Sequence, residues 1–94
     1  MDGGQCGVHT YHNYTQERIN KLLDELKKLG FTVTGSNPWD VDTHNHGVKL
    51  RGQWNASTGD LSVIVTDKSW IVSCSMVWGK IDPILEHVAT ASLE

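Results

Sequence analysis

The sequence predicts an α+β fold. It is a two-layer sandwich with the element order α-β-β-β-β-α, in which a four-stranded antiparallel meander carries both helices on one face. Apolar residues recur at helical spacing between residues 15 and 29, whereas later segments alternate apolar and polar residues as strands do. Short runs of turn residues separate the alternating segments, which favours antiparallel neighbours over crossover connections.

Residues 1–12 are expected to form a flexible N-terminal arm, and residues 13–94 a single α+β domain. Gly3, Gly4 and Gly7 oppose a regular element in the arm, which also lacks any apolar period. A chain of 94 residues buries enough surface for one core and leaves no room for separate substrate and cofactor domains.

The first helix is expected at residues 15–29. Its apolar stripe consists of Ile19, Leu22, Leu23, Leu26 and Leu29. Asn13 or Thr15 can cap the start of the helix, and Gly30 supplies a stop directly after its end.

Four strands are expected after this helix, at residues 31–34, 47–54, 61–65 and 70–78. A loop at residues 56–59 places Trp54 opposite Leu61. The same register places Leu50 opposite Val65, so the second and third strands bury one common face.

The fourth strand rests on the alternation of Trp70, Val72, Cys74, Met76 and Trp78 with polar residues. The last helix is expected to begin at Asp82 and Pro83, an N-cap followed by the proline that helix first turns favour. Ile64, Ile71 and Val77 fall on the other face of the predicted sheet, which indicates that this face is partly covered or contacts a partner.

Composition narrows the functional classes. The net charge is -3 and the eight basic residues are scattered, which argues against nucleic acid as a partner. No apolar run approaches the roughly 18–20 residues of a membrane span. No signal-peptide pattern opens the chain, so a cytoplasmic location is expected. Both cysteines, Cys6 and Cys74, are interpreted as reduced, with Cys74 an inert residue of the core.

The residues from Asp40 to His46 are the first candidate site. Asp42, His44 and His46 share one face of an extended chain, and carboxylate and imidazole groups suit divalent transition metals. The alternative is an ordinary polar loop at residues 38–45 that joins the first two strands.

The N-terminal segment is the second candidate site. Cys6, His9 and His12 lie three residues apart, and thiolate and imidazole ligands at this spacing can chelate zinc together with His44 or His46. The spacing matches no defined zinc module. A Cys74–histidine dyad is disfavoured because Cys74 is predicted to be buried, and no catalytic residue is predicted.

The chain has four tryptophans, and each could lie either in the core or on a surface that contacts a partner. Trp39 follows Pro38 in a predicted loop and is expected to be either an exposed anchor or a lid that closes the sandwich. Trp54, Trp70 and Trp78 fall on the predicted core face.

The sequence therefore favours a small, soluble, non-enzymatic interaction or ligand-binding domain without a cofactor. Its candidate binding residues are Trp39, Ile64, Ile71 and Val77. One alternative is a transition-metal domain or small metal-dependent hydrolase that uses Zn or another divalent ion at Asp42, His44 and His46, with His9 or His12. Another is an inhibitor or immunity-type protein. A protein partner or a homodimer is expected, and neither nucleic acid nor membrane.

Overall fold

The computed structural model describes residues 6–91. Over this range the chain forms five strands and two helices. In chain order they are β1 (Val8–Tyr11), α1 (Gln16–Lys28), β2 (Thr32–Gly35), β3 (Trp39–Asp42), β4 (Lys49–Asn55), β5 (Asp60–Asp67) and α2 (Cys74–Thr90). The predicted α+β class with an antiparallel sheet is confirmed, but the order and the strand count differ from the prediction.

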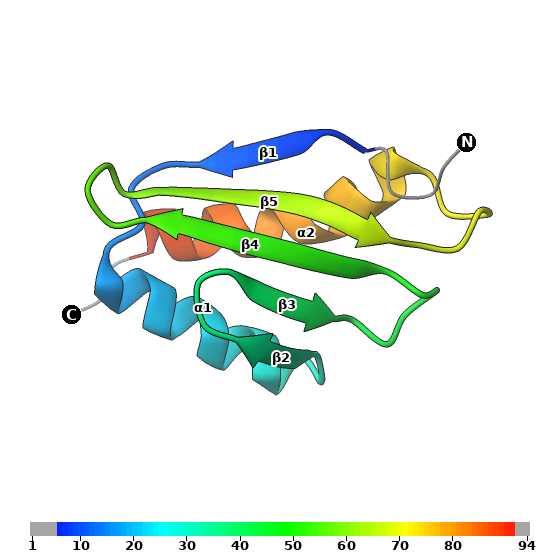
Figure 1. Ribbon diagram of the computed structural model, residues 1–94, viewed down its shortest axis with the longest axis horizontal. Helices are drawn as coiled ribbons and strands as arrows, with labels where there is room; N and C mark the ends of the chain where they lie inside the picture. Colours follow the sequence, from blue (N-terminus) through cyan, green and yellow to red (C-terminus); the bar gives the residue numbers. More distant parts are fainter. Residues whose placement is uncertain (1–5, 92–94) are drawn as a thin grey trace.

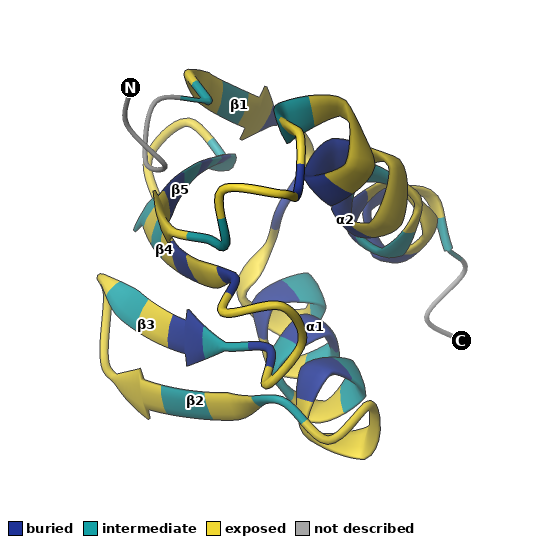
Figure 2. Ribbon diagram, turned by 90° about the vertical axis from the view of Figure 1, so that its right-hand side faces the viewer, coloured by how far each residue is buried: buried dark blue, intermediate teal, exposed yellow. Residues whose placement is uncertain are grey.

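The five strands form one antiparallel sheet in the order β1-β5-β4-β3-β2. Strands β2 to β5 are a meander, and β1 adds to the free side of β5 (Figure 1). Both helices lie on the same side of the sheet, with α1 near β2 and α2 near β1 (Figure 2). The core fills the space between these layers. The sheet residues buried in it are Tyr11, Val41, Leu50, Leu61, Val63 and Val65.

Helix α1 forms where its apolar stripe predicts it. Thr15 is the N-cap, and its hydroxyl accepts a hydrogen bond from the backbone N–H of Arg18 at 3.2 Å. Ile19, Leu22 and Leu26 are buried, and Gly30 follows the last turn with φ of 88°. A left-handed residue at this position ends a helix at little cost only when it is glycine.

The register of the β4–β5 hairpin is confirmed. Leu50 pairs with Val65 and Trp54 with Leu61, as the loop at residues 56–59 requires. Gly59 in this loop has φ of 77°, and a Cβ there would lie 3.4 Å from the carbonyl oxygen of Tyr14. The loop therefore packs closely against the start of α1, and only glycine fits this position without strain.

The β2–β3 hairpin corrects the predicted loop at residues 38–45. Residues 39–42 form β3, which pairs with both β2 and β4 and buries Val41. Asn37 in the turn extends the sheet through its side chain, because its amide donates to the Trp54 carbonyl and accepts from the Trp54 N–H. The strand pattern is thus real for residues 39–42, whereas residues 43–48, which include His44 and His46, form a turn.

The predicted fourth strand at residues 70–78 is wrong. Residues 68–73 form a loop, and α2 begins at Cys74 rather than at Asp82. Ser73 is the N-cap, and its hydroxyl accepts from the Met76 N–H at 3.2 Å. Pro83 lies inside the helix, where it lacks the N–H that would bond the carbonyl of Gly79. Since Gly79 is exposed, that carbonyl is not buried without a partner.

The predicted flexible arm is wrong for residues 8–11, which form β1, whereas residues 1–5 lie outside the described residues. Strand β1 pairs with β5 from Val8 opposite Ile64 to Tyr11 opposite Leu61. Its side chains alternate, so Val8 and Thr10 face outward while Tyr11 is buried against the helices.

A series of contacts fastens β1 to α2. Cys6 and Cys74 form a disulfide, so the prediction that both are reduced is wrong. The His9 ring stacks on Trp78 at 3.7 Å between centroids, and His9 Nδ1 lies 3.1 Å from Asp82 Oδ1. Cys74, Trp78 and Asp82 are four residues apart and share one face of the helix. We call these contacts the β1–α2 clasp.

The disulfide should contribute strongly to stability because it joins residues 68 positions apart. Closing a loop of this length removes conformational entropy from the unfolded chain, worth up to about 4 kcal/mol. We expect the double variant Cys6→Ala, Cys74→Ala to lose about 2–4 kcal/mol of unfolding free energy, measured by urea denaturation.

A reductant should destabilise the native chain by the same amount and leave the double variant unchanged. If the native chain and the variant have the same urea midpoint of unfolding, the clasp does not depend on the disulfide.

Candidate functional site

The loop between β5 and α2 and the first turn of α2 present the most exposed large apolar side chains of the described residues. Trp70 is 88% exposed and Ile71 60%, and Met76 in the first turn of α2 is 58% exposed. We call these three residues the tip surface. The loop projects at one end of the molecule, which measures 41 × 25 × 23 Å (Figure 1).

The loop that carries the tip surface is fixed at several points. The Ser69 N–H donates to the His46 carbonyl at 2.9 Å, which ties the loop to the β3–β4 turn. The Val72 N–H donates back to the Ser69 carbonyl at 3.1 Å, and the Val72 side chain is buried in the core. Cys74 follows directly and is held by the disulfide. Trp70 and Ile71 are therefore exposed on an anchored loop.

A groove of about 200 Å³ lies beside the tip surface, between the β3–β4 turn and the first turns of α2. Its apolar lining includes Phe31, Val48, Val72 and Met76, the last of which belongs to the tip surface as well. His46 and Lys80 also line it, whereas no described lining residue is Asp or Glu. The groove thus combines apolar walls with positive or neutral polar groups, in a chain whose net charge is -3.

The predicted metal ligands of the β3–β4 turn do not converge. His44 and His46 both have positive φ, 56° and 55°. His44 Nε2 lies 2.6 Å from the Thr32 hydroxyl, and its Nδ1 lies 3.7 Å from Asp42 Oδ1. His46 lines the groove beside the tip surface instead. The sequence placed the two histidines on one strand face, but the turn separates their directions.

The predicted N-terminal ligands are likewise apart. His9 contacts Asp82 and Trp78, whereas His12 pairs with Asp60 on the exposed side of β5 at 2.6 Å. The hydrogen bond from His12 lowers the pKa of the Asp60 carboxyl. Cys6 is oxidised in the disulfide. Among residues 6–91, no group of three or more His, Cys, Asp or Glu side chains is arranged to hold a metal ion.

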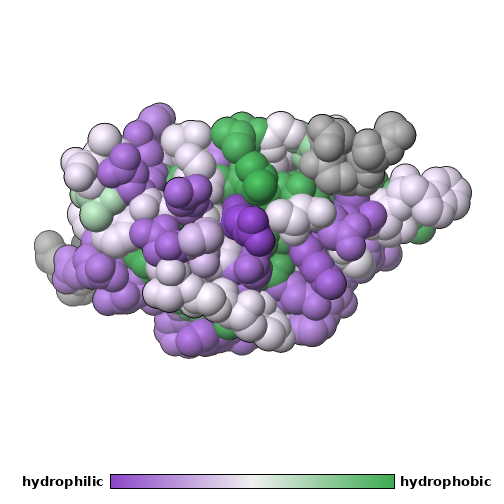
Figure 3. Space-filling view, viewed as in Figure 1, coloured by the Kyte–Doolittle hydropathy of each residue, from purple (hydrophilic) through white to green (hydrophobic). Residues whose placement is uncertain are grey.

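The predicted binding residues lie in four different places. Ile71 belongs to the tip surface, whereas Val77 is buried in α2 and lines the groove beside the tip surface. Trp39 is half-buried in β3 and faces the helices. Ile64 lies on the outer face of the sheet opposite Val8, where a small apolar patch over β1 and β5 interrupts a hydrophilic surface (Figure 3). These four residues do not form the single covered face that the sequence suggested.

Asp82 forms the centre of a cluster of titratable side chains that packs into the β1–α2 interface. Its Oδ1 receives the Tyr11 hydroxyl and also faces His9 Nδ1. Burial is the main cause that raises the pKa of Tyr11 above its usual value, and the bond to Asp82 adds to it. Burial also raises the pKa of Tyr14, whose hydroxyl donates to the Leu85 carbonyl at 2.6 Å. These groups hold the N-terminal segment on α2.

Of the tip surface, only Ile71 was predicted as a binding residue, because Trp70 and Met76 alternate with other apolar residues as they would in a strand. One signal was present. Ser73 followed by Val77, Ile81, Leu85 and Val88 is an N-cap and a helical apolar stripe, and this pattern ends the strand before Cys74.

The two tyrosines predict a loss of stability at high pH. Because the folded protein holds both hydroxyl protons more tightly than the unfolded chain, stability is full below pH 10 and falls as the unfolded tyrosines ionise above it. We expect a loss of about 1 kcal/mol per tyrosine between pH 9.5 and 11, measured by urea denaturation.

The double variant Tyr11→Phe, Tyr14→Phe should be less stable at pH 8 and should lack this part of the pH dependence. An equal decline in the native chain and the variant would show that the tyrosines are not responsible.

Comparison of the chain with models of protein families, with curated protein sequences and with solved structures finds no match. In the part of the chain that the structure describes, neither helix is long and apolar enough to cross a membrane.

Proposed function

We propose that the chain is a non-enzymatic interaction domain that binds a partner protein through the tip surface and its adjoining groove. The observation that supports this most strongly is the exposure of Trp70, at 88%, on a loop anchored by Ser69, Val72 and Cys74. An exposed tryptophan adds little to the fold, whereas in interfaces tryptophan is among the residues that contribute most binding energy.

The anchoring of the loop favours binding. A partner that docks on Trp70 and Ile71 does not have to order the backbone, because the bonds of Ser69 and Val72 already hold it. Ordering a loop or a long side chain on association costs free energy that would otherwise add to affinity. A preordered tip surface therefore supports tighter binding than the same residues on a free loop.

The size and lining of the groove indicate which side chains of the partner could bind there. Its volume of about 200 Å³ is below the ~300–1,000 Å³ of sites for drug-sized ligands. It suits one or two side chains of a partner better than a whole small molecule. Lys80 and His46 at its lining favour carboxylates beside the inserted group. We infer an apolar side chain flanked by Asp or Glu.

The disulfide indicates the kind of compartment in which the chain would bind such a partner. Cys6–Cys74 is typical of proteins that work in oxidising surroundings, which favours such a compartment over the cytoplasm expected from the sequence. An inhibitor or immunity-type role is one form of the proposed interaction. The separate positions of His9, His12, His44 and His46 give no comparable support to a metal-dependent hydrolase.

Selection of a displayed peptide library on the oxidised protein tests this proposal. Enriched peptides should combine a large apolar residue with Asp or Glu, and they should shift the amide NMR signals of Val72, Met76 and Lys80. Trp70→Ala should weaken their binding about 30-fold, as loss of a tryptophan hot spot does, with an unchanged melting temperature.

Val8→Ala is the matched control, because Val8 is also an apolar residue, 57% exposed, but lies on the outer face of the sheet opposite Ile64 and belongs neither to the tip surface nor to the groove. It should leave binding unchanged. Peptides without acidic residues, or binding that Trp70→Ala does not weaken, would contradict the proposal.

A further inference from the structure

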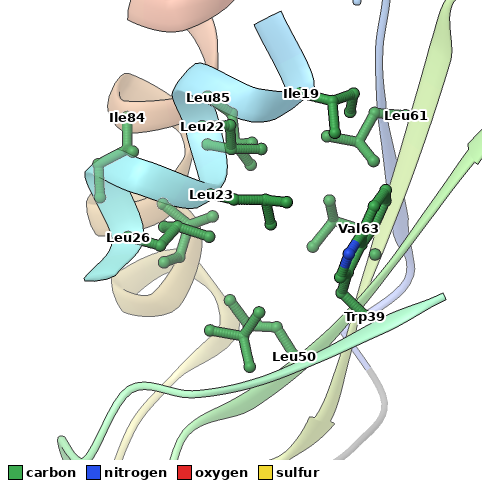
Figure 4. Close-up of a pocket in the computed structure, with 13 residues that line it drawn as sticks. Ile19, Leu22, Leu23, Leu26, Trp39, Leu50, Leu61, Val63, Ile84 and Leu85 are labelled. Atoms are coloured by element: carbon green, nitrogen blue, oxygen red, sulfur yellow. The ribbon is translucent and has the colours of Figure 1, made fainter. Parts of the chain in front are cut away.

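A second site lies inside the sandwich. An apolar cavity of about 40 Å³ separates α1 and α2 from the middle of the sheet. In Figure 4, Leu22, Leu23 and Leu26 of α1 point toward Leu50, Val63 and Trp39 of the sheet, and a space remains between them. All its described lining residues are apolar or glycine, and it shares only Ile81 with the groove beside the tip surface.

Gly52 forms part of the floor of this cavity, and the fold gives no reason for a glycine there. It lies in β4, the middle strand of the sheet, where glycine weakens a strand relative to alanine. Its φ is not positive, and a Cβ would meet only the Leu61 Cδ1 atom, at an ordinary 3.7 Å. No atom of Trp39, which is directly opposite in β3, comes within 4 Å of that position.

The missing side chain therefore leaves room for something other than the chain's own atoms. A glycine within a strand often marks a bulge, a tight bend, or the close approach of another backbone or a ligand. The irregularity of β4 lies at Lys49 and Leu50, and no backbone atom comes within 4 Å of a Cβ at Gly52, which leaves the approach of a ligand. The alternative, that Trp39 packs over Gly52 and replaces the side chain, does not agree with the empty space above Gly52.

The half-buried residues of the cavity lining mark where it comes nearest to the surface. Most of the lining residues are buried, but Leu23, Trp39, Gly52 and Ile84 are only half-buried. Trp39 and Leu23 come from the sheet and from α1 and lie near each other across the space (Figure 4). A molecule can thus enter with one end and keep its other end in water.

The size and the lining of the cavity define the chemistry of the end of the molecule that enters it. A volume of about 40 Å³ is room for about three water-sized groups. Apolar cavities stay dry, and they accept apolar molecules because no polar atom inside offers a hydrogen bond. A charged or hydroxylated end would lose its hydration without compensation.

We propose that this cavity binds the end of an unbranched alkyl chain, about three carbons deep, of a small amphiphile whose polar head remains at the rim beside Trp39. The site is independent of the proposed partner surface, and either can fail without the other.

Hexanoate and adipate test this proposal on the full, oxidised chain, because they share a six-carbon chain and differ in whether one end is apolar. Hexanoate should shift the methyl NMR signals of Leu23, Leu50 and Val63 saturably, and adipate should not. Gly52→Ala should weaken hexanoate binding about fourfold, since its Cβ displaces roughly one methylene of the ligand.

Gly52→Ala should keep the fold and raise the melting temperature of the ligand-free protein by about 4 °C. Gln53→Ala, on the exposed face of the same strand, should change neither hexanoate binding nor the lining signals. The proposal is overturned if hexanoate causes no saturable shift, if adipate binds equally well, or if Gly52→Ala binds hexanoate as the native chain does.

Discussion

The β1–α2 clasp joins the first strand of the described chain to its last helix. The disulfide, the His9–Trp78 stack and the Asp82 carboxylate connect residues near one end of the chain to the first three turns of its last helix. The contacts continue along α2, where Asn13 donates to the Ala89 carbonyl and Arg18 to those of Val88 and Ala91. The N-terminal segment therefore lies along nearly the whole helix and fixes its position over the sheet.

Both candidate sites follow from this placement. Because Cys74 is held at the start of α2, the preceding loop closes between two fixed points and presents Trp70 and Ile71 outward. Because α2 is drawn toward β1 while α1 lies near β2, the helices do not fill the middle of the sheet above Gly52. An unfilled cavity lowers stability and an exposed tryptophan adds little to it, and the clasp offsets part of the cost of the cavity.

Patterns over short stretches of sequence correctly predicted the features of the fold that depend on neighbouring residues. The α1 stripe, its Thr15 cap and the Leu50–Val65 register appear as expected, because spacing along the chain sets them. Long-range constraints account for the failures. No residue near Cys6 in the sequence indicates that Cys6 forms a disulfide with Cys74. Without that disulfide, the residues of β1 look like part of a loose, glycine-rich arm. The apolar and polar residues of 70–78 alternate by coincidence. Val72 is buried because the loop turns it into the core, and Trp78 is buried in α2, where its ring stacks on His9.

The tip surface was largely missed because this false strand pattern assigned Trp70 to a strand.

Native-state hydrogen exchange of the oxidised protein tests most directly whether the clasp makes β1, the loop and α2 one unit. The informative amides are those of Ser69, Val72 and Val77, whose hydrogen bonds hold the loop and the first turn of α2. If it does, these amides open with about the same free energy as the amides that pair β1 with β5, and they open together with them as denaturant is added. If the loop amides open with free energies near zero while the sheet stays protected, the clasp does not order the tip surface.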